Sequence, residues 1–234
     1  MQETFRIDLN GVNCYLLKQD RKFVLFDTGG HTMFDKQFDN RYETLMNQLG
    51  IYKCTPENLK LIVLTHGDID HIVNASALRK HFGAMIAIHE NDRIFVEHPD
   101  IDMIMKTLNF QSVLYKFGFL FIKKQVKKII EKALKGYEKF TPDIFLFDGD
   151  NLNEYGFDAK VFHIPGHTPG SIAIMTSGGE LIAGDIFMNN KRPGIVPKAD
   201  DFTLLKKSVD KIKSMNVKTI LPGHGNPFEL KDFK

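Results

Sequence analysis

Seven residues of this chain have the types and the spacing that a metal-ion site requires, and four of them lie in one short segment. The segment reads THGDIDH, so His66, Asp68, Asp70 and His71 fall within six residues, directly after an apolar run. In an extended loop, side chains two positions apart point to the same side. His71 can join them from the first turn of a following helix. Imidazole and carboxylate groups bind zinc, iron and manganese, so the segment predicts a metal site.

Three further candidate ligands occupy similar places later in the chain. His167 lies in PGHTPGS, Asp185 in AGD and His224 in PGHG, and each comes after an apolar run. Ligands at the ends of separate strands of a layered fold converge on one edge of the sheet. We therefore expect all seven side chains to meet in one pocket.

The elements that must position these residues can be predicted from hydrophobic patterning. Apolar runs of four to six residues cover 22–26, 61–65, 85–88, 159–164, 180–183 and 217–221. Such continuous runs are typical of strands buried on both faces. Helical spacing appears over 71–82, with Gly83 at the expected end, and around 205–212, with Asp200 or Asp201 as N-cap. The pattern predicts one layered α/β domain over residues 1–234.

Residues 100–141 depart from this pattern and predict a helical insertion within the domain. The segment holds nine lysines against four acidic residues, although the whole chain has a net charge of only +2. Apolar residues at helical spacing form one face, and lysines occupy the other. Aromatic residues lie close by, namely Phe110, Tyr115, Phe117, Phe119 and Phe121. This segment could cap the site, receive an acyl chain, form a homodimer contact or touch an anionic membrane; we favour a cap or a dimer element.

The composition is that of an ordinary globular protein and excludes several classes. Of the 234 residues, 43% are hydrophobic and 26% are charged, and the small net charge does not favour nucleic-acid binding. Only two cysteines occur, which argues against a disulfide framework. The first residues lack the pattern of a signal peptide, and no apolar run is long enough to cross a bilayer. We expect a cytoplasmic protein with a small-molecule substrate.

The ordered motifs THGDIDH, PGHTPGS, AGD and PGHG resemble those of the metallo-β-lactamase superfamily of metal-dependent hydrolases. The earlier stretches NCYLL and FDTGG are similar to that family's opening strands. The resemblance extends from Asn13 to Gly225, except over the insertion. It implies a four-layer αββα sandwich with the site along one edge.

Carried over residue by residue, the resemblance implies a centre that binds two divalent metal ions. The first ion would be bound by His66 and His167, and the second by Asp70, His71 and His224. In that family's pattern a carboxylate shared by both ions lies where this chain has Asp185, and Asp70 and Asp185 are the implied catalytic residues.

Two acidic residues need separate treatment. Asp27 resembles the family's buried acid that orients the ligand loops through hydrogen bonds. Asp68 stands where the family usually has a histidine. Two roles stay open for it: a metal ligand, or a residue that does not itself reach the metal. Zinc is the first expectation for the metal ions. Because carboxylate is a harder ligand than imidazole, Asp68 moves the preference towards iron or manganese, which are the alternatives.

The hypothesis that follows is hydrolysis by a metal-bound hydroxide, since coordination lowers the pKa of water from 15.7 towards about 7. The bond cleaved would be an ester, lactone or thioester in a small substrate that is anionic or carries an acyl group. Three alternatives remain: a diiron enzyme that reduces oxygen or nitric oxide, a phosphodiesterase, and a non-catalytic metal-binding protein. Asp68 supports the diiron alternative, whereas the absence of an attached flavin domain in 234 residues argues against it.

Overall fold

Two six-stranded β-sheets form the centre of the computed structural model, which describes residues 2–33, 35 and 38–233. The first sheet has the strand order β1-β2-β3-β4-β5-β6. Its strands are β1 (Gln2–Asp8), β2 (Asn13–Gln19), β3 (Lys22–Phe26), β4 (Leu59–Val63), β5 (Met85–Ile88) and β6 (Ile144–Phe145). β1 to β3 pair antiparallel, and β3 to β6 pair parallel.

The second sheet is formed by the later part of the chain, in the order β12-β11-β9-β8-β7, with β10 paired to β9. Its strands are β7 (Ala159–His163), β8 (Ile172–Thr176), β9 (Glu180–Asn189), β10 (Gly194–Ile195), β11 (Thr219–Gly225) and β12 (Phe228–Glu229). β9 and β11 run parallel, and the register of this pair shifts at Pro222 and again before His224. These irregularities bend β11 where the metal-ligand candidates lie.

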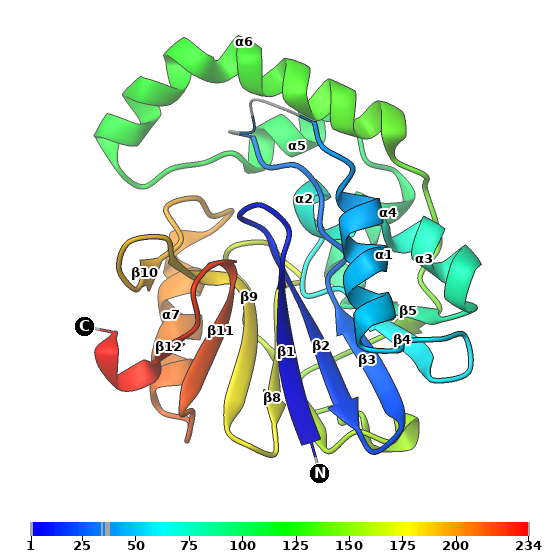
Figure 1. The fold of residues 1–234 in the computed structure, drawn as a ribbon. Coiled ribbons are helices and arrows are strands. Elements are labelled where there is room, and N and C mark those ends of the chain that lie inside the picture. Colours follow the sequence, from blue (N-terminus) through cyan, green and yellow to red (C-terminus); the bar gives the residue numbers. More distant parts are fainter. Residues whose placement is uncertain (1, 34, 36–37, 234) are drawn as a thin grey trace.

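Helices cover the outer faces of both sheets, so the molecule has four layers (Figure 1). The helices are α1 (Arg41–Ile51), α2 (Ile69–Ile72), α3 (Ala75–Phe82), α4 (Arg93–Glu97), α5 (Ile101–Thr107), α6 (Val113–Gly136) and α7 (Phe202–Lys213). α1 and α3 pack on the first sheet, and α7 packs on the second. The predicted four-layer αββα sandwich is confirmed.

The pleat of the strands explains why the sequence shows continuous apolar runs. In β3, Leu25 faces the helices, whereas Val24 and Phe26 face the second sheet. Val161 and Ile174 of the second sheet belong to this same inner cluster. Because alternate residues enter two different cores, consecutive positions of such a strand are buried, as residues 23–26 of β3 are.

The ends of the helices agree with the sequence in two places and differ in one. The Asp201 side chain accepts hydrogen bonds from the backbone N–H groups of Thr203 and Leu204, and so caps α7. Gly83 ends α3 in the left-handed conformation, with φ of 63°. The single helix expected over 71–82 is instead divided into α2 and α3. At the break, the Asn74 side chain donates a hydrogen bond to the Thr28 carbonyl oxygen.

α5 and α6 are the two helices of the insertion, and they run across one end of the molecule above the sheet edges (Figure 1). A small apolar cluster of Leu108, Phe110, Val126 and Ile130 joins them to each other and to Met33. No helix in the described ranges is both long and apolar enough to cross a membrane.

Candidate metal centre

The candidate ligands lie at one edge of the two sheets, and four separate segments supply them. The loop after β4 and the following helix α2 carry four of them, and the loop after β7 carries His167. Asp185 lies within β9 and His224 within β11, so these two are part of strands rather than of the loops that follow them. The apolar run predicted to end at residue 183 is therefore shorter than β9, which continues to Asn189.

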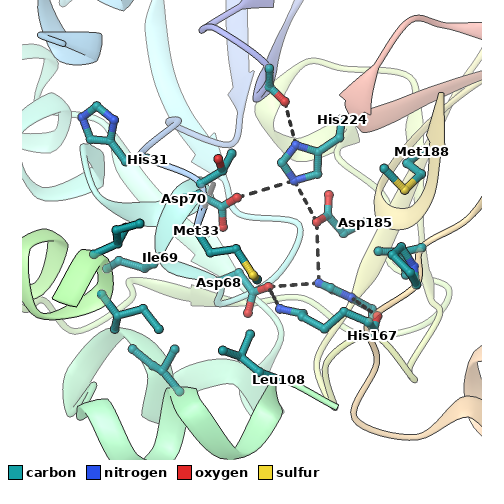
Figure 2. Close-up of a pocket in the computed structure, with 18 of the residues that line it drawn as sticks. His31, Met33, Asp68, Ile69, Asp70, Leu108, His167, Asp185, Met188 and His224 are labelled. Atoms are coloured by element: carbon teal, nitrogen blue, oxygen red, sulfur yellow. Dashed lines mark hydrogen bonds and ion pairs between the residues drawn. The ribbon is translucent and has the colours of Figure 1, made fainter. Parts of the chain in front are cut away.

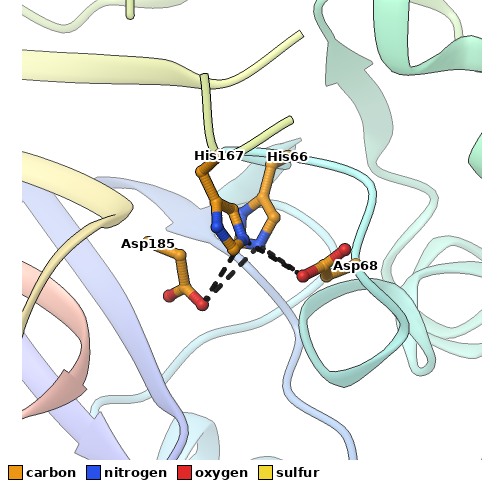
Figure 3. A group of neighbouring side chains, drawn as sticks. All are labelled: His66, Asp68, His167 and Asp185. Carbon is orange, nitrogen blue, oxygen red and sulfur yellow. Dashed lines mark hydrogen bonds and ion pairs between the residues drawn. The ribbon is translucent and has the colours of Figure 1, made fainter. Parts of the chain in front are cut away.

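Four side chains form a first group, which includes Asp68 (Figure 3). One ligand atom from each of His66, Asp68, His167 and Asp185 lies within 4.8 Å of the others. His167 Nε2 is 3.1 Å from Asp68 Oδ2 and 3.7 Å from Asp185 Oδ2. His66 Nε2 is 3.7 Å from the same Asp68 oxygen. Two imidazoles and two carboxylates thus surround one point.

A second group lies beside the first, and Asp185 of the first group faces it. Asp70, His71 and His224 each offer a ligand atom within 4.8 Å of the other two. Asp185 Oδ1 is 3.4 Å from His71 Nε2, whereas its Oδ2 is 3.1 Å from His224 Nε2. Because Oδ2 also faces His167, the Asp185 carboxylate lies between the two groups. The seven predicted residues therefore meet in one place.

The four histidines are all held by Nδ1, which leaves Nε2 directed into the centre. His167 Nδ1 is 3.1 Å from the Lys198 carbonyl oxygen, and His224 Nδ1 is 2.6 Å from that of Gly11. His71 Nδ1 is 2.9 Å from Asp27 Oδ2. These partners only accept, so Nδ1 carries a proton, and Nε2 is the nitrogen that can bind a metal once it is deprotonated.

Asp27 fixes the loop that carries His66 as well as the ring of His71. It follows β3 at a positive φ of 59°, and both of its oxygens are occupied. Oδ1 accepts from Thr65 N–H at 2.7 Å, and Oδ2 accepts from Thr65 Oγ1 at 2.8 Å. Because Thr65 Oγ1 donates to Asp27, it accepts from His66 Nδ1, 3.0 Å away. Asp27 thus orients two ligands, and the orienting role expected for it agrees with these contacts.

Three buried ligand atoms of the described centre have no hydrogen-bond partner although they could form one. They are His66 Nε2, His71 Nε2 and Asp185 Oδ1, and all three point into the centre. Leaving a buried polar group unpaired costs about 1–3 kcal/mol each. A bound cation would satisfy all three, and the donor set of imidazoles and carboxylates is one that divalent metal ions accept. The residues fit a dinuclear metal site.

The side-chain charges of the centre are strongly coupled. Burial and the neighbouring His71 lower the pKa of His66. Burial opposes the charged form of His71, yet the carboxylates of Asp185 and Asp27 raise its pKa. For His224, burial is likewise outweighed by Asp185, which raises the pKa to about 9. Without an ion, the carboxylates therefore hold protons on nearby imidazoles, and metal binding must release protons.

Asp92 is a buried acid that the sequence analysis missed. It ends a short 3₁₀ turn before α4 and has no exposed surface. Its Oδ2 accepts from Gly67 N–H at 2.8 Å and from Thr168 Oγ1 at 2.7 Å, and its Oδ1 accepts from Gly170 N–H at 2.7 Å. The carboxylate thereby ties the loop of His66 to the loop of His167. Its place in the sequence offers no signal, since both loops are distant along the chain.

Lys198 is a second residue that the sequence analysis missed. It is only 8% exposed, and its Nζ donates a hydrogen bond to Asp68 Oδ2. Although burial favours the neutral amine, Asp68 raises the pKa of Lys198. In turn, Lys198 outweighs the effect of burial and holds the pKa of Asp68 low. The negative charge that Asp68 adds, relative to the usual histidine, is therefore balanced by a lysine from the same chain.

Backbone packing at the centre requires glycine at position 223. A side chain there would collide with the Asp185 carboxylate and with the His71 ring. Gly223 lets β11 approach β9 closely, and the approach brings His224 beside Asp185.

A cavity of about 490 Å³ opens onto the metal-ligand candidates (Figure 2). Asp68, Asp70, His167, Asp185 and His224 line one side of it. The other side is apolar and includes Ile104 and Leu108 of the α5 region and Ile129, Ile130 and Ala133 of α6. Phe110 and Tyr115 also line the cavity, as a cap would, whereas Phe117 and Phe121 are exposed on the outside of α6.

The family model of the metallo-beta-lactamase superfamily matches residues 7–224, and the chain belongs to this superfamily. It is a hydrolase of the α/β class with a His/Asp metal-binding cluster. The motifs that suggested this resemblance in the sequence are the segments that build the centre.

Curated relatives include two with described activities. The hydroxyacylglutathione hydrolase GloC of Haemophilus influenzae is 28% identical, over 92% of this chain and 85% of that protein. The acyl-coenzyme A thioesterase MBLAC2 of Homo sapiens is 23% identical, over 66% of this chain and 56% of that protein. Among solved structures, the B3 metallo-beta-lactamase BLEG-1 has a TM-score of 0.70 and 24% identity, covering 98% of this chain and 95% of that one.

Proposed function

We propose that this protein is a thioester hydrolase that uses two divalent metal ions, zinc in the first place, and takes small substrates with an acyl group. The observation that carries the proposal is the cavity, which joins five of the seven candidate ligands to an apolar wall, with the other two directly behind them. The names of two relatives describe thioester hydrolysis, and they support this reaction class over the ester and lactone alternatives.

Metal ions bound at this centre would lower the pKa of a coordinated water and polarise the scissile carbonyl. The chain's own residues prepare the site for that chemistry. Asp185 would contact both ions, His66, Asp68 and His167 the first, and Asp70, His71 and His224 the second. Asp70 also lines the cavity, with its Oδ2 3.5 Å from His224 Nε2. From that position Asp70 can orient the attacking water and accept its proton.

The apolar wall supports an acyl group as the part of the substrate that the insertion binds. Ile129, Ile130 and Ala133 come from the inner face of α6 and line the cavity opposite the metal-ligand side chains. Each methylene buried there contributes about 0.8 kcal/mol, or about fourfold in binding. A chain of a few carbons can therefore be held with its carbonyl at the centre.

A substrate panel tests the proposal. Zinc-loaded protein is offered acyl thioesters of one thiol, from acetyl to dodecanoyl, and release of the thiol is measured. We expect turnover, with kcat/KM rising by up to about fourfold per methylene until the cavity is full. If zinc is bound but no thioester of any length is cleaved, the proposed function is wrong.

Assays on the same zinc-loaded or purified protein distinguish the three alternative functions. A phosphodiesterase would cleave bis(4-nitrophenyl) phosphate but no thioester. A diiron redox enzyme would retain two irons per chain after aerobic purification and would consume oxygen in the presence of a reductant. A non-catalytic metal-binding protein would bind metal and turn over none of these compounds.

A further inference from the structure

The first half of α6 exposes a set of large apolar side chains that the rest of the described chain leaves uncovered. Val113 is 80% exposed, Phe117 59% and Phe121 74%, and Leu114 and Leu120 are also exposed. The Phe117 and Phe121 rings contact each other, with centroids 5.1 Å apart. In Figure 1 this end of α6 extends beyond the two sheets.

These side chains lie on the outer side of the helix, away from the cavity. Val113, Phe117, Leu120 and Phe121 follow each other at spacings of four, three and one, which places them on one face of an α-helix. The buried residues of α6, which include Val126 and Ile129, lie on the opposite face. The outer apolar set is therefore not part of the core, and burial by the described residues does not explain it.

Lysines surround this apolar set. The exposed Lys116, Lys123, Lys124, Lys127 and Lys128 follow or interrupt it along α6. Between residues 103 and 130 the sequence has six lysines and not one aspartate or glutamate. The outer side of α6 thus combines exposed apolar side chains with a mainly cationic flank, in which Lys127 Nζ lies 3.9 Å from Asp102 Oδ1.

We propose that the outer face of the first half of α6 (residues 113–128) docks on an anionic lipid surface. Apolar and aromatic side chains of an amphipathic helix enter the boundary between headgroups and acyl chains, and lysines on the same helix attract anionic headgroups. The proposal goes beyond the proposed function and does not depend on which bond is cleaved. Tyr115 lies on the same turns of α6 but lines the cavity, so the cavity and the proposed docking face lie on opposite sides of the helix.

The charge pattern favours lipid over a second copy of this chain. Two copies packed through this face would bring five lysines from each chain together, and among the described residues only Lys127 of these has an acidic partner, Asp102 at 3.9 Å. Like charges brought together oppose association, whereas an anionic bilayer offers charge of the opposite sign.

Vesicle sedimentation of the full-length protein tests the proposal. We expect the protein to sediment with vesicles in which phosphatidylserine forms about one third of the lipid, and to stay in solution with phosphatidylcholine alone. Salt should weaken binding, because the lysine contribution is screened. The variants F117S/F121S and K123E/K124E should each weaken binding by about tenfold or more.

The matched control is K53E/K60E, which changes the charge equally near β4, far from α6. It should bind anionic vesicles as the unmodified chain does, and circular dichroism should show that all variants are folded. Three results would overturn the proposal: no sedimentation with anionic vesicles, equal loss in the control, or a dimer in analytical ultracentrifugation that F117S/F121S converts to monomer. The last would identify the face as an interface between copies.

Discussion

The metal-centre edge and the α5–α6 insertion are built in opposite ways. At the centre, polar groups from distant segments are buried and paired with one another, as with Asp27 to Thr65 and Asp92 to Gly67. The insertion is held to the rest by a small apolar cluster that includes Val126 and Ile130, and much of α6 is exposed. Directional contacts fix the ligand atoms, whereas the apolar contacts fix only which face of α6 turns inward. The chemistry and the substrate contacts can therefore be altered separately, and substitutions should reveal this.

The largest effect should follow substitution of the carboxylate shared by the two groups. D185N removes the charge that faces both His71 and His224 while keeping the shape of the side chain. We expect kcat/KM to fall on the order of 10³-fold, with metal content below that of the unmodified protein. Steady-state kinetics and elemental analysis measure the two. Full activity with full metal content would show that Asp185 is not a ligand.

Substitution of Asp92 should reduce stability more than substitution of an exposed acidic residue does. In D92N, the amide NH₂ must face one of the donors from Gly67, Thr168 or Gly170, and that donor loses its partner. We expect the free energy of unfolding in urea to fall by about 2–4 kcal/mol. The control D210N, at an exposed position of α7, should change it by less than about 0.5 kcal/mol. Equal effects of the two would contradict the role of Asp92 in joining the loops.

These two acids show what the sequence could predict and what it could not. His66, Asp185 and the other candidates were predictable because ligand types follow apolar runs, and the runs at 22–26 and 85–88 match β3 and β5. Asp92 and Lys198 gave no such signal, since their partners come from segments far away in the sequence. Burial of a lone acid or lysine is decided by tertiary contacts that no local pattern contains.

The insertion illustrates the same limit. The stripe that includes Val126, Ile129 and Ala133 was predicted to be an apolar face, and these residues are buried. Phe117 and Phe121 were expected to belong to a cap or a dimer element; both are exposed on the outside of α6, so they do not cap the site. Periodicity indicates which residues share a face, but clustering of aromatic residues does not indicate which face turns inward.

Lys198 should affect metal binding through its contact with Asp68. K198M leaves the buried Asp68 carboxylate without its cation, and we expect zinc affinity to change by about 10–100-fold, measured by competition with a chelating dye. The double variant D68H/K198M removes both charges and should restore affinity towards the original value. If K198M alone leaves affinity unchanged, the lysine does not tune the site.

The smallest effect should follow a change in the apolar wall. A133W fills part of the cavity from α6, and we expect kcat/KM to fall by about tenfold for long acyl thioesters and little for acetyl. The unmodified chain has no tryptophan, so quenching of the introduced indole's fluorescence by a non-hydrolysable alkyl ligand gives a second readout. An equal loss at every chain length would place the acyl group elsewhere.

The central claim is that seven side chains from separate segments form one two-ion centre. Calorimetric titration of zinc into metal-free protein tests it most directly. The account predicts two ions per chain, with proton release on binding, and a lower stoichiometry in D185N. Binding of no zinc, or full binding that survives loss of His167 and His224 together, would contradict it.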